Sequence, residues 1–171
     1  MSDIPRWFGR EFAFCFSENL YPNICARLRG CPARLEETLQ AASHDGLTRK
    51  PDRKWSAQEH AGHLLDLEPL WLARVEDYSK NSEQLTAADL QNRKTDEAHY
   101  NEQPLEEILA QFRSAREKLL RRVEEIEPSL FGRAIPHPRL KTPMRLVDHL
   151  FFVAEHDDHH LARIWELINQ G

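Results

Sequence analysis

The sequence predicts an all-α fold, a four-helix bundle. Four long stretches carry apolar side chains every three to four residues, which is the period of an amphipathic helix. Glycine is scarce, with 6 in 171 residues, and no Asn-Gly or Asp-Gly pair lies between alternating apolar residues to mark a β-hairpin. Four such helices joined by connections of different length are typical of a bundle.

The first helix is expected over residues 23–42, where the apolar stripe consists of Ile24, Leu28, Leu35 and Leu39. Gly30-Cys31-Pro32 interrupts this pattern, and proline lacks a backbone N–H, so we expect a kink or a restart there. After a loop from residue 43 to residue 52, Ser56-Ala57-Gln58-Glu59 fits a capping box and predicts the start of the second helix. This helix is expected to run to about Tyr78 and to bend at Pro69.

The polar stretch 79–103 connects to the third helix and is expected to hold a short helix opened by Thr86-Ala87-Ala88-Asp89. Pro104 is the expected first residue of the third helix, which ends near Pro128. For the fourth helix, Thr142 is the expected N-cap and Pro143 the first residue. Its apolar stripe extends to the C-terminus through Leu146, Leu150, Val153, Ile164 and Leu167.

Composition limits the possible functions. The length favours a single domain over residues 1–171, and a net charge of −5 gives no electrostatic footprint for nucleic acid. No apolar run reaches the roughly 18 residues that a membrane span needs, and the N-terminus does not resemble a secretory signal, so a cytoplasmic protein is expected. The three cysteines, Cys15, Cys25 and Cys31, have neither the number nor the spacing of a disulfide framework or a thiolate zinc site.

Two histidines in the fourth helix have the spacing of metal ligands. His156 and His160 are four residues apart, so their imidazoles lie on one helix face, level with the apolar stripe. Inward-facing imidazoles without a partner would be costly. Two ring nitrogens at this spacing can reach one ion at about 2.0–2.1 Å.

A third ligand is expected from the second helix. His63 lies at the centre of its apolar face, and His60, one turn nearer the helix start, is the alternative. His149 lies about 10 Å along the axis from His156, too far to share the ion. His159 is expected to face solvent or to support a ligand, and the remaining histidines, His44, His99 and His137, fall in expected loops or the connection, where His137 could border a pocket.

Acidic residues near these histidines have weaker signals. His156-Asp157-Asp158-His159-His160 superficially resembles the His-Glu-x-x-His helix of metalloproteases, but aspartate is one methylene shorter than the glutamate that acts as general base there. Asp66 and Glu68 are candidate acceptors for imidazole N–H groups, and surface charge is an equally good interpretation. Trp55, Trp71 and Trp165 are expected to fill the core or the ends of the bundle.

Two segments, 55–68 around Trp55-Ser56 and Gly62-His63-Leu64, and 151–164 around His156-x-x-x-His160, resemble the DinB-like/YfiT superfamily of DNA-damage-inducible-type metalloproteins. The resemblance covers about residues 22–169, which leaves 1–21 as an N-terminal extension. It implies an up-down-down-up bundle with a long crossover between the second and third helices, at 79–103. It also implies that His63, His156 and His160 bind a divalent metal, with zinc, nickel and manganese as candidates, and that the protein forms a homodimer.

The resemblance leaves the reaction open, because some members are thiol S-transferases and many have no assigned activity. The first hypothesis is a metal-dependent thiol S-transferase that acts on small electrophiles with a low-molecular-weight thiol as cosubstrate. The second is a metal-dependent hydrolase that uses a metal-bound hydroxide, and the third is a non-catalytic metal-binding stress-response protein. No basic cluster marks a site for an anionic thiol; the candidate residues are Arg139, Lys141, Arg145 and Arg163.

Overall fold

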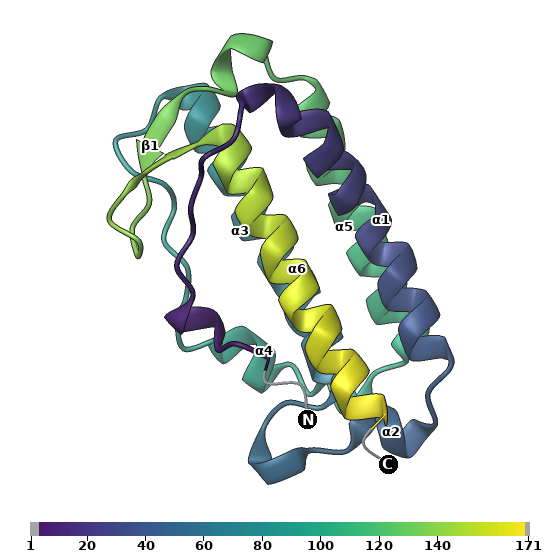
Figure 1. Ribbon diagram of the computed structural model, residues 1–171. Coiled ribbons are helices and arrows are strands. Elements are labelled where there is room, and N and C mark those ends of the chain that lie inside the picture. The colour runs from purple at the N-terminus through teal and green to yellow at the C-terminus, as the bar shows by residue number, and fades with distance from the viewer. Residues whose placement is uncertain (1–3, 170–171) are drawn as a thin grey trace.

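The computed structural model describes residues 4–169 and is dominated by four long helices, as predicted (Figure 1). These are α1 (Tyr21–Gln40), α3 (Ala57–Lys80), α5 (Leu105–Glu124) and α6 (Leu146–Asn169). Two short helices, α2 (His44–Thr48) and α4 (Arg93–Glu97), and two short strands, β1 (Ala134–Pro136) and β2 (Pro143–Arg145), lie between them. Single turns of 3-10 helix occur at Trp7–Gly9, Glu18–Leu20, Pro51–Arg53, Tyr100–Glu102 and Pro128–Leu130.

Ion pairs between helices define their directions. Arg116 of α5 pairs with Glu68 of α3, and six residues later Arg122 pairs with Glu76, so α3 and α5 run parallel. By contrast, Arg29 pairs with Glu124 and Arg113 with Glu36, so α1 and α5 run in opposite directions (Figure 1).

The fourth helix runs opposite to α3. The start of α3 lies against the end of α6, where His60 contacts His160, and the Tyr78 hydroxyl near the end of α3 donates to the carbonyl of Met144, just before α6 begins. The order is therefore up-down-down-up, and the connection from Asn81 to Pro104 must cross the length of the bundle. This is the topology that the family resemblance implied.

The α1 helix continues through Pro32, so of the kink or restart expected at Gly30-Cys31-Pro32 the restart was wrong. A proline at this position leaves the carbonyl of Leu28, four residues earlier, without its helical donor. The guanidinium of Arg116 supplies a replacement, since its Nη1 donates to the Leu28 oxygen at 3.3 Å. A side chain of α5 thus replaces the hydrogen bond that Pro32 removes from α1.

The expected start of the fourth helix at Thr142-Pro143 was also wrong. Residues 143–145 pair as β2 with β1 in an antiparallel hairpin, with Ile135 opposite Met144. Both of these side chains are buried in the core, and that burial favours the extended pairing over an earlier helical turn. The α6 helix then begins at Leu146, and the Asp148 carboxylate accepts the backbone N–H of Arg145 at 2.9 Å.

The connection between α3 and α5 contains helix α4, but not where the sequence analysis placed a helix. Asp89 does not cap a helix opened at Thr86; its carboxylate accepts the backbone N–H groups of Gln91 and Arg93, and helix begins at Arg93. The connection packs tightly on α3. A Cβ on Gly62 would lie 2.1 Å from the Tyr100 ring, so only glycine allows this approach.

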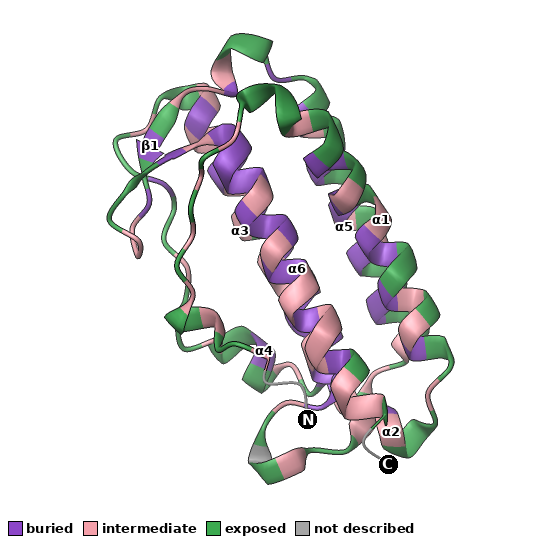
Figure 2. Ribbon diagram, viewed as in Figure 1, coloured by how far each residue is buried: buried purple, intermediate pink, exposed green. Residues whose placement is uncertain are grey.

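The buried interior is divided by a polar layer. One apolar cluster surrounds Leu28, Val75 and Leu150, and the other surrounds Leu35, Leu64 and Phe112. Between them, the buried guanidinium of Arg116 forms ion pairs with the buried carboxylates of Glu68 and Asp157. Buried positions recur along all four long helices (Figure 2). Among residues 4–169, no helix is long and apolar enough to cross a membrane.

Candidate metal centre

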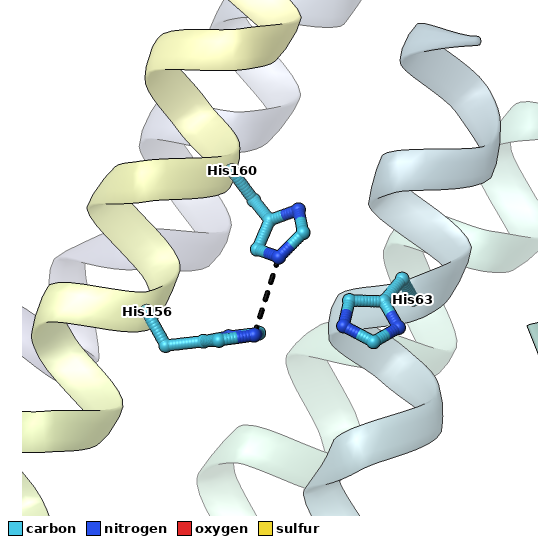
Figure 3. Close-up of side chains that lie close together, drawn as sticks. All are labelled: His63, His156 and His160. Atoms are coloured by element: carbon cyan, nitrogen blue, oxygen red, sulfur yellow. Dashed lines mark hydrogen bonds between the residues drawn. The ribbon is translucent and has the colours of Figure 1, made fainter. Parts of the chain in front are cut away.

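Three buried histidines from two helices meet between α3 and α6. One ring nitrogen from each of His63, His156 and His160 lies within 4.8 Å of the others, and the three imidazoles converge on a common space (Figure 3). These are the three residues that the sequence analysis selected. Imidazole nitrogens grouped in this way can hold a metal ion.

The pair on α6 shows how closely the nitrogens approach. Nε2 of His156 lies 3.2 Å from Nε2 of His160. Two nitrogens bound at about 2.0–2.1 Å to one tetrahedral ion would be about 3.3 Å apart. Nδ1 of His156 is buried and has no hydrogen-bond partner among the described residues. The observed separation therefore suits a shared ion without rearrangement of the helix.

A hydrogen-bonded chain orients His63. The Thr95 hydroxyl of α4 donates to the Asp66 carboxylate at 2.9 Å, so its oxygen is left to accept from Nδ1–H of His63 at 3.1 Å. The Tyr100 hydroxyl donates to the other Asp66 oxygen at 2.7 Å. This arrangement places the proton of His63 on Nδ1 and leaves the Nε2 lone pair free for an ion.

His60 supports the group instead of replacing His63 in it. Its Nδ1 lies 2.8 Å from Nδ1 of His160, so one of the two rings donates to the other. When His160 is the donor, its Nε2 keeps a free lone pair on the side of His156. His60 then acts on His160 as Thr95 acts on His63, by fixing the tautomer.

Burial keeps these imidazoles neutral, which is the form that binds a metal. It lowers the pKa of His63 to about 4 and that of His60 to about 3. For His156 and His160, burial and the neighbouring imidazoles hold the pKa well below its usual value. No carboxylate belongs to the group, so the three ring nitrogens would leave the full charge of a divalent ion uncompensated.

The histidines line a cavity of about 580 Å³ that continues along α3 and α6. Trp55 packs against His63 with ring centres 4.6 Å apart, and Trp7 stands nearly perpendicular to His156 at 4.9 Å. The N-terminal segment, expected only as an extension, thus forms part of the pocket wall. Arg163 anchors this segment, because its Nη2 donates to the carbonyl of Ile4 at 2.9 Å.

The acidic candidates have other roles. Asp157 is fully buried and pairs with Arg116, so the resemblance to a metalloprotease helix does not extend to its acid. Glu68 pairs with the same guanidinium and contacts no imidazole. Asp66 does act on a histidine of the group, because the Thr95 hydroxyl links its carboxylate to His63.

The remaining histidines and tryptophans are distributed differently from the prediction. His137 was expected in a loop and is in one, but it is buried and lines the pocket. His149 is completely buried with its ring 5.8 Å from that of Trp71, and neither ring nitrogen has a hydrogen-bond partner among the described residues. Trp165, expected in the core or at an end of the bundle, is 61% exposed, whereas Trp71 is buried on the pocket wall.

Two residues of the site and its pocket, Thr95 and Arg74, were not predicted from the sequence. Thr95 has no local signal, since its role depends on how the connection folds back onto α3. Arg74 had one: it follows Leu67 and Trp71 on the inward stripe of α3, and a charged residue within an apolar stripe is unusual.

The fold and the histidine group define a class of protein, the four-helix bundles that carry a histidine cluster between helices. A family model for the DinB superfamily matches residues 27–164, and the chain belongs to that superfamily. Among solved structures it is similar to YfiT from Bacillus subtilis, with a TM-score of 0.80 and 18% identity over 92% of this chain and 91% of that one. YfiT is described as a probable metal-dependent hydrolase with an unusual four-helix bundle topology. A search of curated proteins finds no match to the sequence.

Proposed function

We propose that this protein is a metal-dependent hydrolase of small molecules, with a divalent transition metal held by His63, His156 and His160. The observation that carries the proposal is the convergence of three buried, neutral imidazoles at the wall of a 580 Å³ pocket. The description of YfiT supports it.

The donor set narrows the choice of metal. Imidazole nitrogens suit zinc and nickel, whereas manganese favours carboxylate and water oxygens. When bound, such an ion supplies Lewis acidity and lowers the pKa of a water molecule towards about 7. Thr95 orients His63, and His60 holds His160 in the required tautomer when it accepts from Nδ1–H of His160. Trp7 packs on His156 and Trp55 on His63, which limits the access of bulk water to both rings.

Thiol S-transfer is the second candidate. The observation that favours it is the presence in the same pocket of Arg74 and Arg139, neither of which has a carboxylate partner among the described residues. Low-molecular-weight thiols that carry carboxylates would complement these charges.

The decisive experiment is metal content by elemental analysis of protein purified without a histidine tag. One equivalent of zinc or nickel is expected in the wild type, with loss in His160→Ala and retention in the control His44→Ala, whose side chain is exposed on α2. Absence of metal from the wild type after reconstitution with zinc, nickel and manganese would refute the proposal.

Activity then separates the two reactions. Loaded protein should hydrolyse a member of a panel of small esters and amides without added thiol. Turnover of electrophiles that requires a thiol, with no hydrolysis in its absence, would instead establish the S-transferase.

A further inference from the structure

The far end of the pocket contains buried cationic and N–H donor groups that lack acceptors. Arg74 of α3 is 2% exposed, and in residues 4–169 no carboxylate oxygen lies within 4.0 Å of its guanidinium. The Nε of Arg74 donates to the carbonyl of Thr86 at 2.8 Å. Its Cζ lies 5.4 Å from the centre of the Trp71 ring. A buried guanidinium with one neutral acceptor is poorly compensated, because it has five N–H groups and no acceptor of its own.

Two further donors at the same end lack acceptors. Nη2 of Arg139, on the β1–β2 hairpin, and Nε1 of Trp71 are both buried without a hydrogen-bond partner among the described residues. The Arg139 guanidinium lies over the rings of Phe8 and Phe152, so aromatic faces hold it in the pocket and no acid does.

His137 does not resolve the shortage. Its Nδ1 accepts the backbone N–H groups of Arg139 and Leu140, so its hydrogen is on Nε2, which faces Nη1 of Arg74 at 3.1 Å. In that tautomer the Nε2–H of His137 and an Nη1–H of Arg74 face each other, and neither group can accept a hydrogen bond. With the hydrogen on Nδ1 instead, the conflict moves to the two backbone N–H groups. In either tautomer of His137, at least one N–H group beside it lacks an acceptor.

Nearby acids are already engaged. The Asp77 carboxylate accepts from the backbone N–H and the hydroxyl of Thr86, and Asp89 accepts the backbone N–H groups of Gln91 and Arg93. Buried polar groups in native proteins are nearly always satisfied, so a group of donors without acceptors points to a ligand that supplies them.

We propose that Arg74, Arg139 and the indole N–H of Trp71 form an anion subsite that binds a carboxylate or phosphate group of the pocket's ligand. Trp71 also lies 5.6 Å, ring to ring, from His156, so the subsite and the histidine group share one wall. Leu67, Leu70 and Phe152 line the same cavity and give it apolar surface. His63 and Arg74 are eleven residues apart, which is about 16 Å along a helix.

The ligand class follows from this arrangement: an amphiphile with an anionic group at Arg74 and Arg139, an apolar part, and a reacting group at the histidines. The placement of the reacting group at the histidines rests on the proposed function. Binding of the anion does not, because none of the three subsite residues belongs to the histidine group.

The test measures binding by isothermal titration calorimetry with three probes of equal chain length: octanoate, octyl phosphate and 1-octanol. Wild-type protein should bind at least one anion about tenfold or more tightly than the neutral alcohol. Whichever of octanoate and octyl phosphate binds with the lower Kd identifies the anionic group that the subsite prefers. Equal affinity for the alcohol and both anions would overturn the subsite.

Variants then locate the effect. Arg139→Gln should weaken anion binding about tenfold or more and leave 1-octanol unchanged, whereas the control Lys141→Gln removes an exposed charge from the same hairpin loop and should have no effect. Arg74→Met should show the same loss while remaining folded by circular dichroism. Wild-type anion affinity in Arg139→Gln would refute the assignment whether or not the Arg74 variant folds.

The same titration in His160→Ala separates this inference from the proposed function. Anion binding should persist there. If the wild type binds anions but no metal, the hydrolase fails and the subsite stands. If it binds metal but shows no preference for anions, the subsite fails and the hydrolase stands.

Discussion

Arg116 and Arg74 are both buried arginines on bundle helices, and they differ in their partners. Arg116 uses all five N–H groups: Nε donates to Glu68, Nη1 to Asp157 and to the carbonyl of Leu28, and Nη2 to Glu68 and Asp157. Arg74 donates to one carbonyl and faces an imidazole that is itself short of acceptors. Accordingly, the carboxylates raise the pKa of Arg116 despite its burial, whereas burial lowers the pKa of Arg74 to about 10.

This difference distinguishes a structural group from a binding group. A guanidinium with every donor satisfied by its own chain holds helices together. A guanidinium whose donors line a cavity without acceptors is available to bind a ligand, and the fold tolerates the cost of its desolvation.

The largest expected effect tests this distinction directly. Arg116→Met leaves Glu68 and Asp157 buried without a counter-charge, so we expect a loss of about 3–5 kcal/mol in the free energy of unfolding. Arg74→Met removes an uncompensated charge and should change that free energy by less than about 1 kcal/mol. Urea denaturation of both variants measures the difference, and equal destabilisation would show that the two arginines have the same role.

The histidines differ in the same way: Thr95 sets the tautomer of His63, whereas Nδ1 of His156 has no hydrogen-bond partner among the described residues. Thr95→Val removes the hydroxyl that joins His63 to Asp66. We expect metal affinity to fall about 10- to 100-fold, measured by competition with a chelator. Thr38→Val, which removes an exposed hydroxyl on α1, is the control. Unchanged affinity in the Thr95 variant would mean that the hydroxyl does not orient the ligand.

A pH titration measures the cost of an unsatisfied buried group. Complete burial holds the pKa of His149 well below 6.5, so this imidazole is neutral in the folded protein and protonates when the chain unfolds. Its contribution to stability is therefore present above pH 6.5 and is lost as the pH falls. Between pH 7 and pH 5, His149→Leu should lose less stability than the wild type, by up to about 2 kcal/mol. Parallel urea denaturation of the metal-free proteins at both pH values tests this, and an equal loss would contradict it.

The smallest effect comes from an exposed pair. Arg29 and Glu124 are 3.0 Å apart, with 58% and 62% of their side chains exposed. Arg29→Met should change the free energy of unfolding by less than about 0.5 kcal/mol, because water screens the pair. A larger loss, in the same denaturation series as Arg116→Met, would show that burial does not govern how much these arginines contribute.

Local patterns predicted the helices, and long-range contacts accounted for most of the differences. The capping box at Ser56 and Glu59 is present, because both of its hydrogen bonds lie within one helical turn. The histidine group could be proposed because helical periodicity places His156 and His160 on one face. The continuation of α1 through Pro32 could not, because it depends on Arg116 in a helix more than eighty residues later. The hairpin at Ile135 and Met144 likewise depends on burial against distant residues.

The crossover between α3 and α5 touches both ends of the pocket. Its Thr86 carbonyl accepts from Arg74, and its Thr95 hydroxyl accepts from His63. Tyr100 fastens the same segment over Gly62 and Asp66. A library that diversifies this connection while retaining Thr95, Tyr100 and the four helices would therefore vary ligand selectivity on a constant scaffold, which makes the crossover the natural target for engineering this bundle.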